Sequence, residues 1–234
     1  MADASSISKP QLIRLPILLS LNAGYTDAAG FLALQGLFTA HVTGNFVTLG
    51  AALALGTTGV VAKLLALPVF CVGVLLTRLL SFALVARKQP DLAVLLAIKV
   101  ALLAAGAVLA LTFGPFRNGD AWQAILTGMV LVLAMSIQNA VQRLHLASAP
   151  PSTLMTGTTT QIMIDIASLI HGVPADQRPA LLARFNQMLA GLAAFAIGCG
   201  LAAGLFAWTG TWCFVLPPLF GLAALVMRAP PVKH

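Results

Sequence analysis

Charged residues make up only 8% of this 234-residue chain, and glutamate is absent, so its six acidic residues are all aspartates. Soluble domains carry about a quarter charged residues, and a chain with so few could not cover a water-facing surface. Hydrophobic residues make up 59%, and apolar windows recur that are long enough to cross a bilayer core of about 30 Å. The short alternating segments of a membrane β-barrel are absent. The composition therefore predicts an all-α membrane protein that crosses the bilayer several times.

The basic excess does not indicate a nucleic-acid-binding surface. Lys and Arg total 13, which gives a formal net charge of +7 and a pI of about 10.0. These residues are thinly spread and lie mainly at the ends of apolar runs, where membrane proteins carry their topology signals. We therefore expect the lipid bilayer as a partner, and no nucleic acid.

The sequence lacks the motifs that catalytic and metal sites need. Cys71, Cys199 and Cys213 stand singly in apolar runs without CxxC spacing, so we expect neither a metal site nor a disulfide framework. HExxH, the P-loop and the glycine-rich nucleotide fingerprint are missing. We expect no cofactor and no enzymatic activity. One alternative pairs Asp27 with Asp165 as the carboxylates of an intramembrane aspartyl protease, but the two lie at non-equivalent places in the chain.

Six apolar runs are predicted as membrane spans, and two further segments, His41–Gly56 and Thr153–Ile170, are too short or too polar. If both short segments crossed the membrane, Arg87 and Lys88 would move to the outside. Six spans with a cytoplasmic N-terminus instead put most Lys and Arg inside, as the positive-inside rule requires. The charges thus predict six transmembrane helices, two short half-helices and both termini in the cytoplasm. The predicted spans are Leu15–Phe38, Val60–Val85, Leu92–Phe113, Trp122–Leu144, Phe185–Trp208 and Trp212–Met227.

Residues 1–14 are predicted to form a cytoplasmic tail. No small-residue cleavage site follows a short apolar core in this stretch, so a removed signal peptide is not expected. The first span is interpreted as a retained transmembrane helix.

Two parts of the chain resemble each other and predict an internal repeat. "LSLNAGYTDAAG" is followed by "HVTGNFVTL", and in the second half "LAMSIQNAVQ" is followed by "LMTGTTTQI". Asp27 aligns with Asn139, with one residue of slippage relative to the Thr-Gly pairs at 43–44 and 156–157. Each half, 15–117 and 118–234, then holds three full spans, so the halves have opposite orientations. Such inverted repeats are typical of transporters.

The two Thr-Gly segments predict a polar site in the middle of the membrane. Glycine and threonine weaken a continuous helix, but threonine caps helix starts well. A half-helix that begins inside the membrane would direct free N–H groups and its positive dipole end at a small polar or anionic solute. The alternative is that these small residues only allow close helix packing. The residues predicted for this site are Asn22, Asp27, Thr43, Gly44, Asn45, Gln138, Asn139, Thr156, Gly157 and Thr158.

Asp27 is the sharpest of these candidates because it lies near the middle of the first span. A carboxylate there costs several kcal/mol unless it is paired, hydrated or protonated, so an intramembrane acid marks a functional site by default. The structural alternative is a neutral Asp27 that is hydrogen-bonded to Asn139 or Gln138. Lys99 is the candidate cationic partner, and His41 is interpreted as an interfacial residue.

The stretches "NAGYTDAAGFLAL", "HVTGNFVTLG", "QNAVQR" and "TLMTGTTTQIMID" together resemble the YoaK-like family of bacterial membrane proteins. The resemblance extends from about Leu15 to Met227, and the Asp followed by Thr-Gly-Asn is its most specific part. It implies a bacterial multi-pass inner-membrane protein. It implies no substrate or activity, because the family is classed by a domain of unknown function.

Two functional hypotheses follow. The first is a small-solute transporter or channel whose central site contains the Thr-Gly segments, with Asp27 as a proton-coupling acid. The second is a membrane interaction or assembly protein that transports nothing and uses its small-residue surfaces for helix packing against partners. A homo-oligomer is a separate candidate assembly of the chain, and a homodimer alone would disfavour this second hypothesis.

Overall fold

A computed structural model describes residues 9–228, and these residues form helices joined by loops without any strand. The longest helices fall where the sequence predicts spans, because in a bilayer the backbone must satisfy its hydrogen bonds within each segment. The elements in chain order are α1 (Lys9–Ala33), α2 (Gly44–Leu55), α3 (Val60–Ala86), α4 (Asp91–Phe113), α5 (Trp122–His145), α6 (Met155–His171), α7 (Arg178–Thr209), the 3₁₀ helix η2 (Gly210–Val215) and α8 (Leu216–Arg228).

Four stretches of the described residues are long and apolar enough to cross a membrane. They are α3, α4, α5 and the continuous run Arg178–Met227, which includes α7, η2 and most of α8. Helix α1 is 25 residues long but is more polar, because it carries Asn22, Thr26 and Asp27 on adjoining turns. The structure thus agrees with an all-α, multi-pass membrane protein.

The first helix differs most from its predicted bounds of Leu15–Phe38. It begins at Lys9, inside the predicted tail, and it ends at Ala33. Gln35 and Gly36 follow with positive φ values of 56° and 82°, and the amide of Gly36 bonds the carbonyl of Phe31 at 2.9 Å. This Schellman-type reversal ends the helix early, and the chain turns back where the apolar pattern alone predicted another turn of helix.

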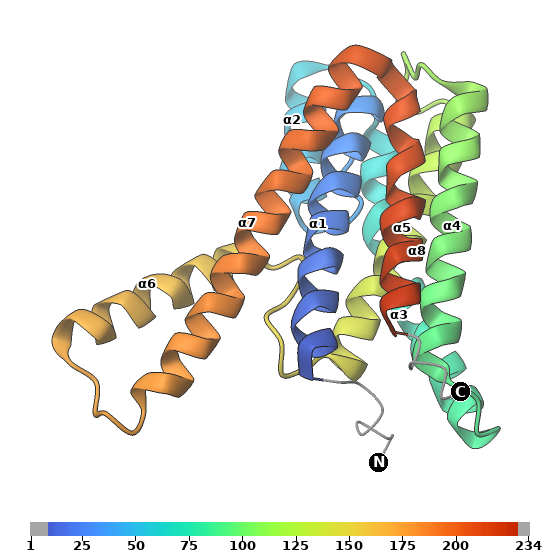
Figure 1. Cartoon of the computed structure of the whole chain (residues 1–234). Coiled ribbons are helices and arrows are strands. Elements are labelled where there is room, and N and C mark those ends of the chain that lie inside the picture. The colour runs from blue at the N-terminus through green and yellow to red at the C-terminus, as the bar shows by residue number, and fades with distance from the viewer. Residues whose placement is uncertain (1–8, 229–234) are drawn as a thin grey trace.

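The long helices form a bundle, and Lys9 and Arg228 lie at the same end of it (Figure 1). We call this the lower end. Helices α1 and α7 run upward, whereas α5 and α8 run downward. Helix α6 and the first part of α7 form a hairpin that projects from the bundle. Within that hairpin Arg184 Nε donates to Asp165 Oδ2 at 3.1 Å.

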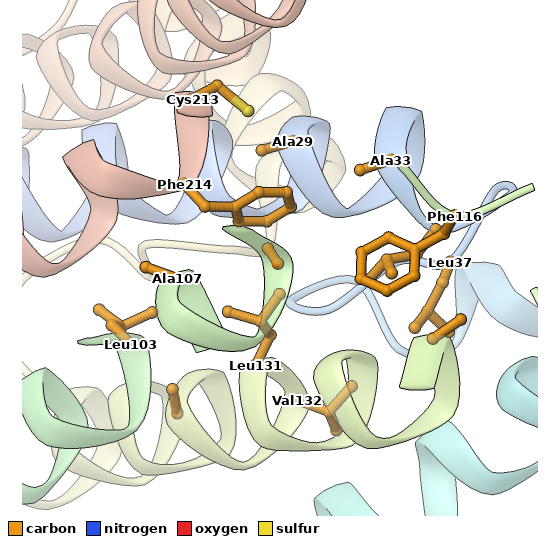
Figure 2. Close-up of a cluster of buried hydrophobic side chains, with 14 of the residues drawn as sticks. Ala29, Ala33, Leu37, Leu103, Ala107, Phe116, Leu131, Val132, Cys213 and Phe214 are labelled. Atoms are coloured by element: carbon orange, nitrogen blue, oxygen red, sulfur yellow. The ribbon is translucent and has the colours of Figure 1, made fainter. Parts of the chain in front are cut away.

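Small residues allow the central helices to cross closely. A Cβ at Gly198 of α7 would overlap a backbone oxygen of α1, and one at Gly24 of α1 would overlap the carbonyl of Phe195. Helices α3 and α5 cross in the same way, with Gly73 against Ser136. Apolar side chains fill the space between the helices, and Figure 2 shows the cluster that α1, α4, α5 and η2 build from Ala29, Leu103, Leu131 and Phe214.

Asp120, in the loop between α4 and α5, caps the upper start of α3. Its carboxylate accepts the amides of Gly59 at 2.8 Å and Val61 at 2.7 Å. We expect Asp120→Ala to lower the free energy of unfolding by about 1–3 kcal/mol, because two charge-assisted bonds at a helix N-terminus are lost. Asp176→Ala, in an exposed loop, is the matched control and should change it by less than about 0.5 kcal/mol. Unfolding of the purified protein in mixed micelles measures both, and equal values would contradict the capping role.

Candidate functional site

Asp27 holds the loop between α1 and α2 inside the bundle. It is 3% exposed and lies six residues before the end of α1, which is about 9 Å along the helix. The loop folds back along α1, so that Asp27 Oδ1 accepts the amides of Thr39 and Ala40, both at 2.7 Å. The N–H groups that face inward here therefore bind the carboxylate of the protein itself.

His41 is the side-chain partner of Asp27, which the sequence analysis did not predict. Its Nδ1 lies 2.7 Å from Asp27 Oδ2, and its ring lies edge-on to Phe195 with centroids 5.3 Å apart. The imidazole also approaches the backbone of Thr153, which belongs to the loop before α6. Asp27 thus has donors on both oxygens, and His41 connects the two loops.

The start of α2 differs from a half-helix with free amides. Thr43 occupies the N-cap position, but its side chain makes no capping bond. The amides of Gly44 and Asn45 bond the carbonyls of His41 and Val42 at 2.8 and 3.2 Å. Tight turns before the helix thus bond within the chain two of the amides that the sequence prediction directed at a solute.

Asn45 has a role in loop structure. It is buried, its Oδ1 accepts the amide of Phe38 at 2.9 Å, and its Nδ2 donates to the carbonyl of Phe38 at 2.8 Å. This reciprocal pair fixes the loop against the first turn of α2.

The loop before α6 is organised in the same way around Asn139. Asn139 lies six residues before the end of α5, and its Oδ1 accepts the hydroxyl of Thr153 at 2.7 Å. Gln142 supports the loop by donating to the carbonyls of Leu146 and Pro150, both at 3.1 Å. In both places a polar side chain six residues before a helix end binds the following loop.

The second Thr-Gly segment, 156–157, takes no part in the contact between Asn139 and Thr153. Helix α6 begins at Met155, so Thr156 and Gly157 fall in its first turn, where both are exposed. Thr158 is buried, and its hydroxyl donates to the carbonyl of Leu154 at 3.0 Å. The loop residue Thr153, three positions earlier than Thr156, is the one that reaches the other half.

Asn22 and Gln138 lie buried in the bundle. Gln138 Oε1 accepts from the ammonium of Lys99, and its Nε2 donates to the carbonyl of Leu19 at 2.8 Å. The predicted pairing of Lys99 with Asp27 is therefore wrong. Asn22 Oδ1 accepts the hydroxyl of Thr26 at 3.1 Å, and Asn22 Nδ2 has no partner among the described residues.

Two open pockets flank the contact between the loops. The upper pocket has a volume of about 630 Å³ and the lower pocket about 450 Å³. Asp27, Ala28, Phe31, Leu32, Phe38, His41, Thr43, Gly44, Phe195, Cys199 and Ala203 line the upper pocket. Phe70, Val74, Arg78, Asn139, Ala140, Gln142, Arg143, Leu144, Pro151, Thr153 and Leu154 line the lower pocket.

The linings of the two pockets correspond position by position. Each α1 residue of the upper pocket has a counterpart in the lower pocket 112 positions later: Asp27 and Asn139, Ala28 and Ala140, Phe31 and Arg143, Leu32 and Leu144. Each α7 residue has a counterpart in α3 125 positions earlier: Phe195 and Phe70, Cys199 and Val74, Ala203 and Arg78. Of these pairs, the sequence repeat indicated only Asp27 with Asn139. It matched the two Thr-Gly segments and missed the correspondence of His41 with Thr153 and the two arginines.

Comparison with known proteins gives a family and no established activity. No solved structure matches the chain. A 158-residue stretch is 32% identical to the UPF0700 transmembrane protein YoaK of Bacillus subtilis (strain 168) and covers 64% of this chain and 65% of that relative. The match of residues 15–227 to the family described as "Protein of unknown function (DUF1275)" agrees with the resemblance read from the motifs, and the chain belongs to that YoaK-like family of membrane proteins.

Proposed function

We propose that this protein moves a small solute across a bacterial inner membrane. In this proposal α1, α3, α4, α5, α7 and the η2–α8 unit are the six spans, and α2 and α6 are the inserted half-helices. Residues 15–117 and 118–234 are the two inverted halves. The predominance of Lys and Arg at the lower end, for example Arg87, Lys88 and Arg143, supports a cytoplasmic position for that end and for both termini.

The packing of the helices supports the inverted repeat. Both halves run helix, fold-back loop, short helix, helix and helix, and α1 and α5 run in opposite directions (Figure 1). The close crossing of Gly24 with α7 corresponds to that of Ser136 with Gly73 of α3. Gly198 and Gly73 also obey the spacing of 125 positions that relates the pocket linings.

The observation that carries the proposal is the contact between His41 and Thr153. His41 lines the upper pocket, Thr153 lines the lower pocket, and the imidazole approaches the backbone of Thr153. The two pockets, one in each proposed half, therefore approach each other at these two residues. Moving the loops apart would connect them, which is the geometry that alternating access around a midplane site requires. Asp27 supplies the ionisable group at this barrier.

A non-transporting assembly protein is the second candidate, and the projecting α6–α7 hairpin is the observation that favours it. Ile164 and Ile170 of α6 are 52% and 81% exposed, and such surfaces suit another protein or a second copy as well as lipid. Affinity capture from gently solubilised membranes discriminates, because a stoichiometric protein partner would support assembly. Enzymatic activity is not part of either proposal, since Asp27 and Asp165 have separate partners, His41 and Arg184.

Water access to the upper pocket tests the transport proposal. Cys199 lines this pocket, Cys213 is buried, and Cys71 can be replaced. In a Cys71→Ser, Cys213→Ala protein, we expect a membrane-impermeant methanethiosulfonate added from outside the cell to label Cys199. A Cys71→Ser, Cys199→Ala protein, which keeps only Cys213, is the matched control and should stay unlabelled. Equal, slow reaction of both thiols would mean that the pocket is dry.

Flux is measured on the same protein in proteoliposomes. Swelling is followed by light scattering with a panel of small organic acids, amines and sugars. We expect at least one class to enter faster than in protein-free vesicles, and Asp27→Asn to slow that entry. Absence of flux for the whole panel, together with an unlabelled Cys199, would refute the proposal.

A further inference from the structure

We propose that the lower pocket binds a small organic anion, a carboxylate that carries an apolar body. This inference deepens the proposed function, on which it rests, by naming the class of solute. It rests on a difference in charge between the two pockets, whose linings can be compared at corresponding positions.

The lower pocket is positively charged and has no acid in its lining. Arg78 of α3 and Arg143 of α5 both line it, and neither forms an ion pair with any described residue. Arg78 lies over the ring of Phe82, with 3.9 Å from its Cζ to the centroid. Stacking on a ring occupies the face of a guanidinium and leaves its in-plane N–H groups available. Two exposed guanidinium groups thus line one pocket without a counter-anion from the described residues.

The upper pocket carries no arginine at the corresponding positions. Phe31 stands where the lower pocket has Arg143, and Ala203 stands where it has Arg78. Asp27, the acid of the upper pocket, is replaced by the neutral Asn139. All three differences make the lower pocket more favourable for a negative charge, and helix packing does not require them because the upper pocket packs without them.

The rest of the lining suits an apolar body. Phe70, Val74, Leu144 and Leu154 provide hydrophobic walls. The volume of about 450 Å³ lies within the range of small-molecule sites. Asn139 and Thr153 add neutral polar groups to the lining. A carboxylate can accept guanidinium N–H groups in pairs, while its apolar part lies against the walls.

The test is equilibrium binding of radiolabelled benzoate to the purified full-length protein. We expect saturable binding that weakens about tenfold or more in Arg78→Gln, Arg143→Gln. Arg117→Gln removes an exposed arginine outside the pocket and should bind as the wild type does. Arg78→Lys, Arg143→Lys keeps both charges and should recover part of the affinity. Unchanged binding in the Gln variant, with an unchanged gel-filtration profile, would overturn the proposal.

Competitors separate the possible sources of the anion. Benzamide, which has the same body without the charge, should not displace benzoate, and inorganic phosphate should displace it poorly. Displacement by phosphate as effectively as by unlabelled benzoate would overturn the apolar part of the proposal. Phosphatidylglycerol that co-purifies with the wild type, is lost in the Gln variant and blocks benzoate would assign the pocket to a lipid headgroup and overturn it.

Binding and transport can fail separately. If benzoate does not bind while another solute in the panel is transported, this inference is wrong and the proposed function stands. If benzoate binds through the arginines but nothing crosses the membrane, the site stands and the transport proposal is wrong.

Discussion

Asp27→Ala is expected to lower the free energy of unfolding by about 3–5 kcal/mol and to abolish any flux. The substitution leaves the amides of Thr39 and Ala40 and the imidazole of His41 without their acceptor. Each donor left unsatisfied at a buried site costs about 1–3 kcal/mol. Without the carboxylate, the bonds that hold Thr39, Ala40 and His41 against α1 are lost.

Asp27→Asn separates the structural role of the side chain from its charge. The amide Oδ1 can still accept the two backbone amides of the loop, so we expect most of the stability to remain. The group can no longer ionise, so proton-coupled flux should be lost. Unfolding in mixed micelles and flux in proteoliposomes measure the two effects. An alanine variant as stable as the wild type would show that the loop does not depend on Asp27.

Gly198→Ala is expected to be strongly destabilising. A Cβ at this position would overlap the carbonyl oxygen of Leu21 and lie 2.8 Å from the amide nitrogen of Tyr25. Both are backbone atoms of α1, so relief requires the two helices to move apart. Overpacking of this kind costs about 1–3 kcal/mol and more where backbone must shift. We expect a loss of at least about 3 kcal/mol, because the whole α1–α7 crossing is affected.

Gly200→Ala, two residues further along the same helix, is the matched control. No atom lies within 4 Å of its Cβ position. Replacing a helical glycine in open space with alanine should raise stability by about 0.5–1 kcal/mol. The two alanine variants are compared by unfolding in the same micelles. Equal effects would mean that α1 and α7 do not cross closely at Gly198.

Much of the fold follows from the sequence alone. Composition and the length of the apolar runs predict a helical membrane protein, because a bilayer leaves the backbone few alternatives. The predicted spans Val60–Val85 and Leu92–Phe113 lie within one residue of α3 and α4 at each end. The two short polar segments, His41–Gly56 and Thr153–Ile170, coincide closely with α2 and α6. Local signals suffice here, since a helix is built from contacts between near neighbours.

Only the tertiary structure decided the partners at the candidate site. Asp27 is bonded by His41, 14 positions later, and not by Lys99 or Asn139, because the chain reverses at Gln35 and Gly36 and folds back along α1. The same reversal uses the loop amides on Asp27, and tight turns bond two amides at the start of α2 within the chain. The pairing of Arg78 with Arg143 in one pocket likewise needs α3 against α5, which no local pattern records. Apolar periodicity indicates which residues avoid water. The contacts between polar groups depend instead on the packing of helices that are distant in sequence.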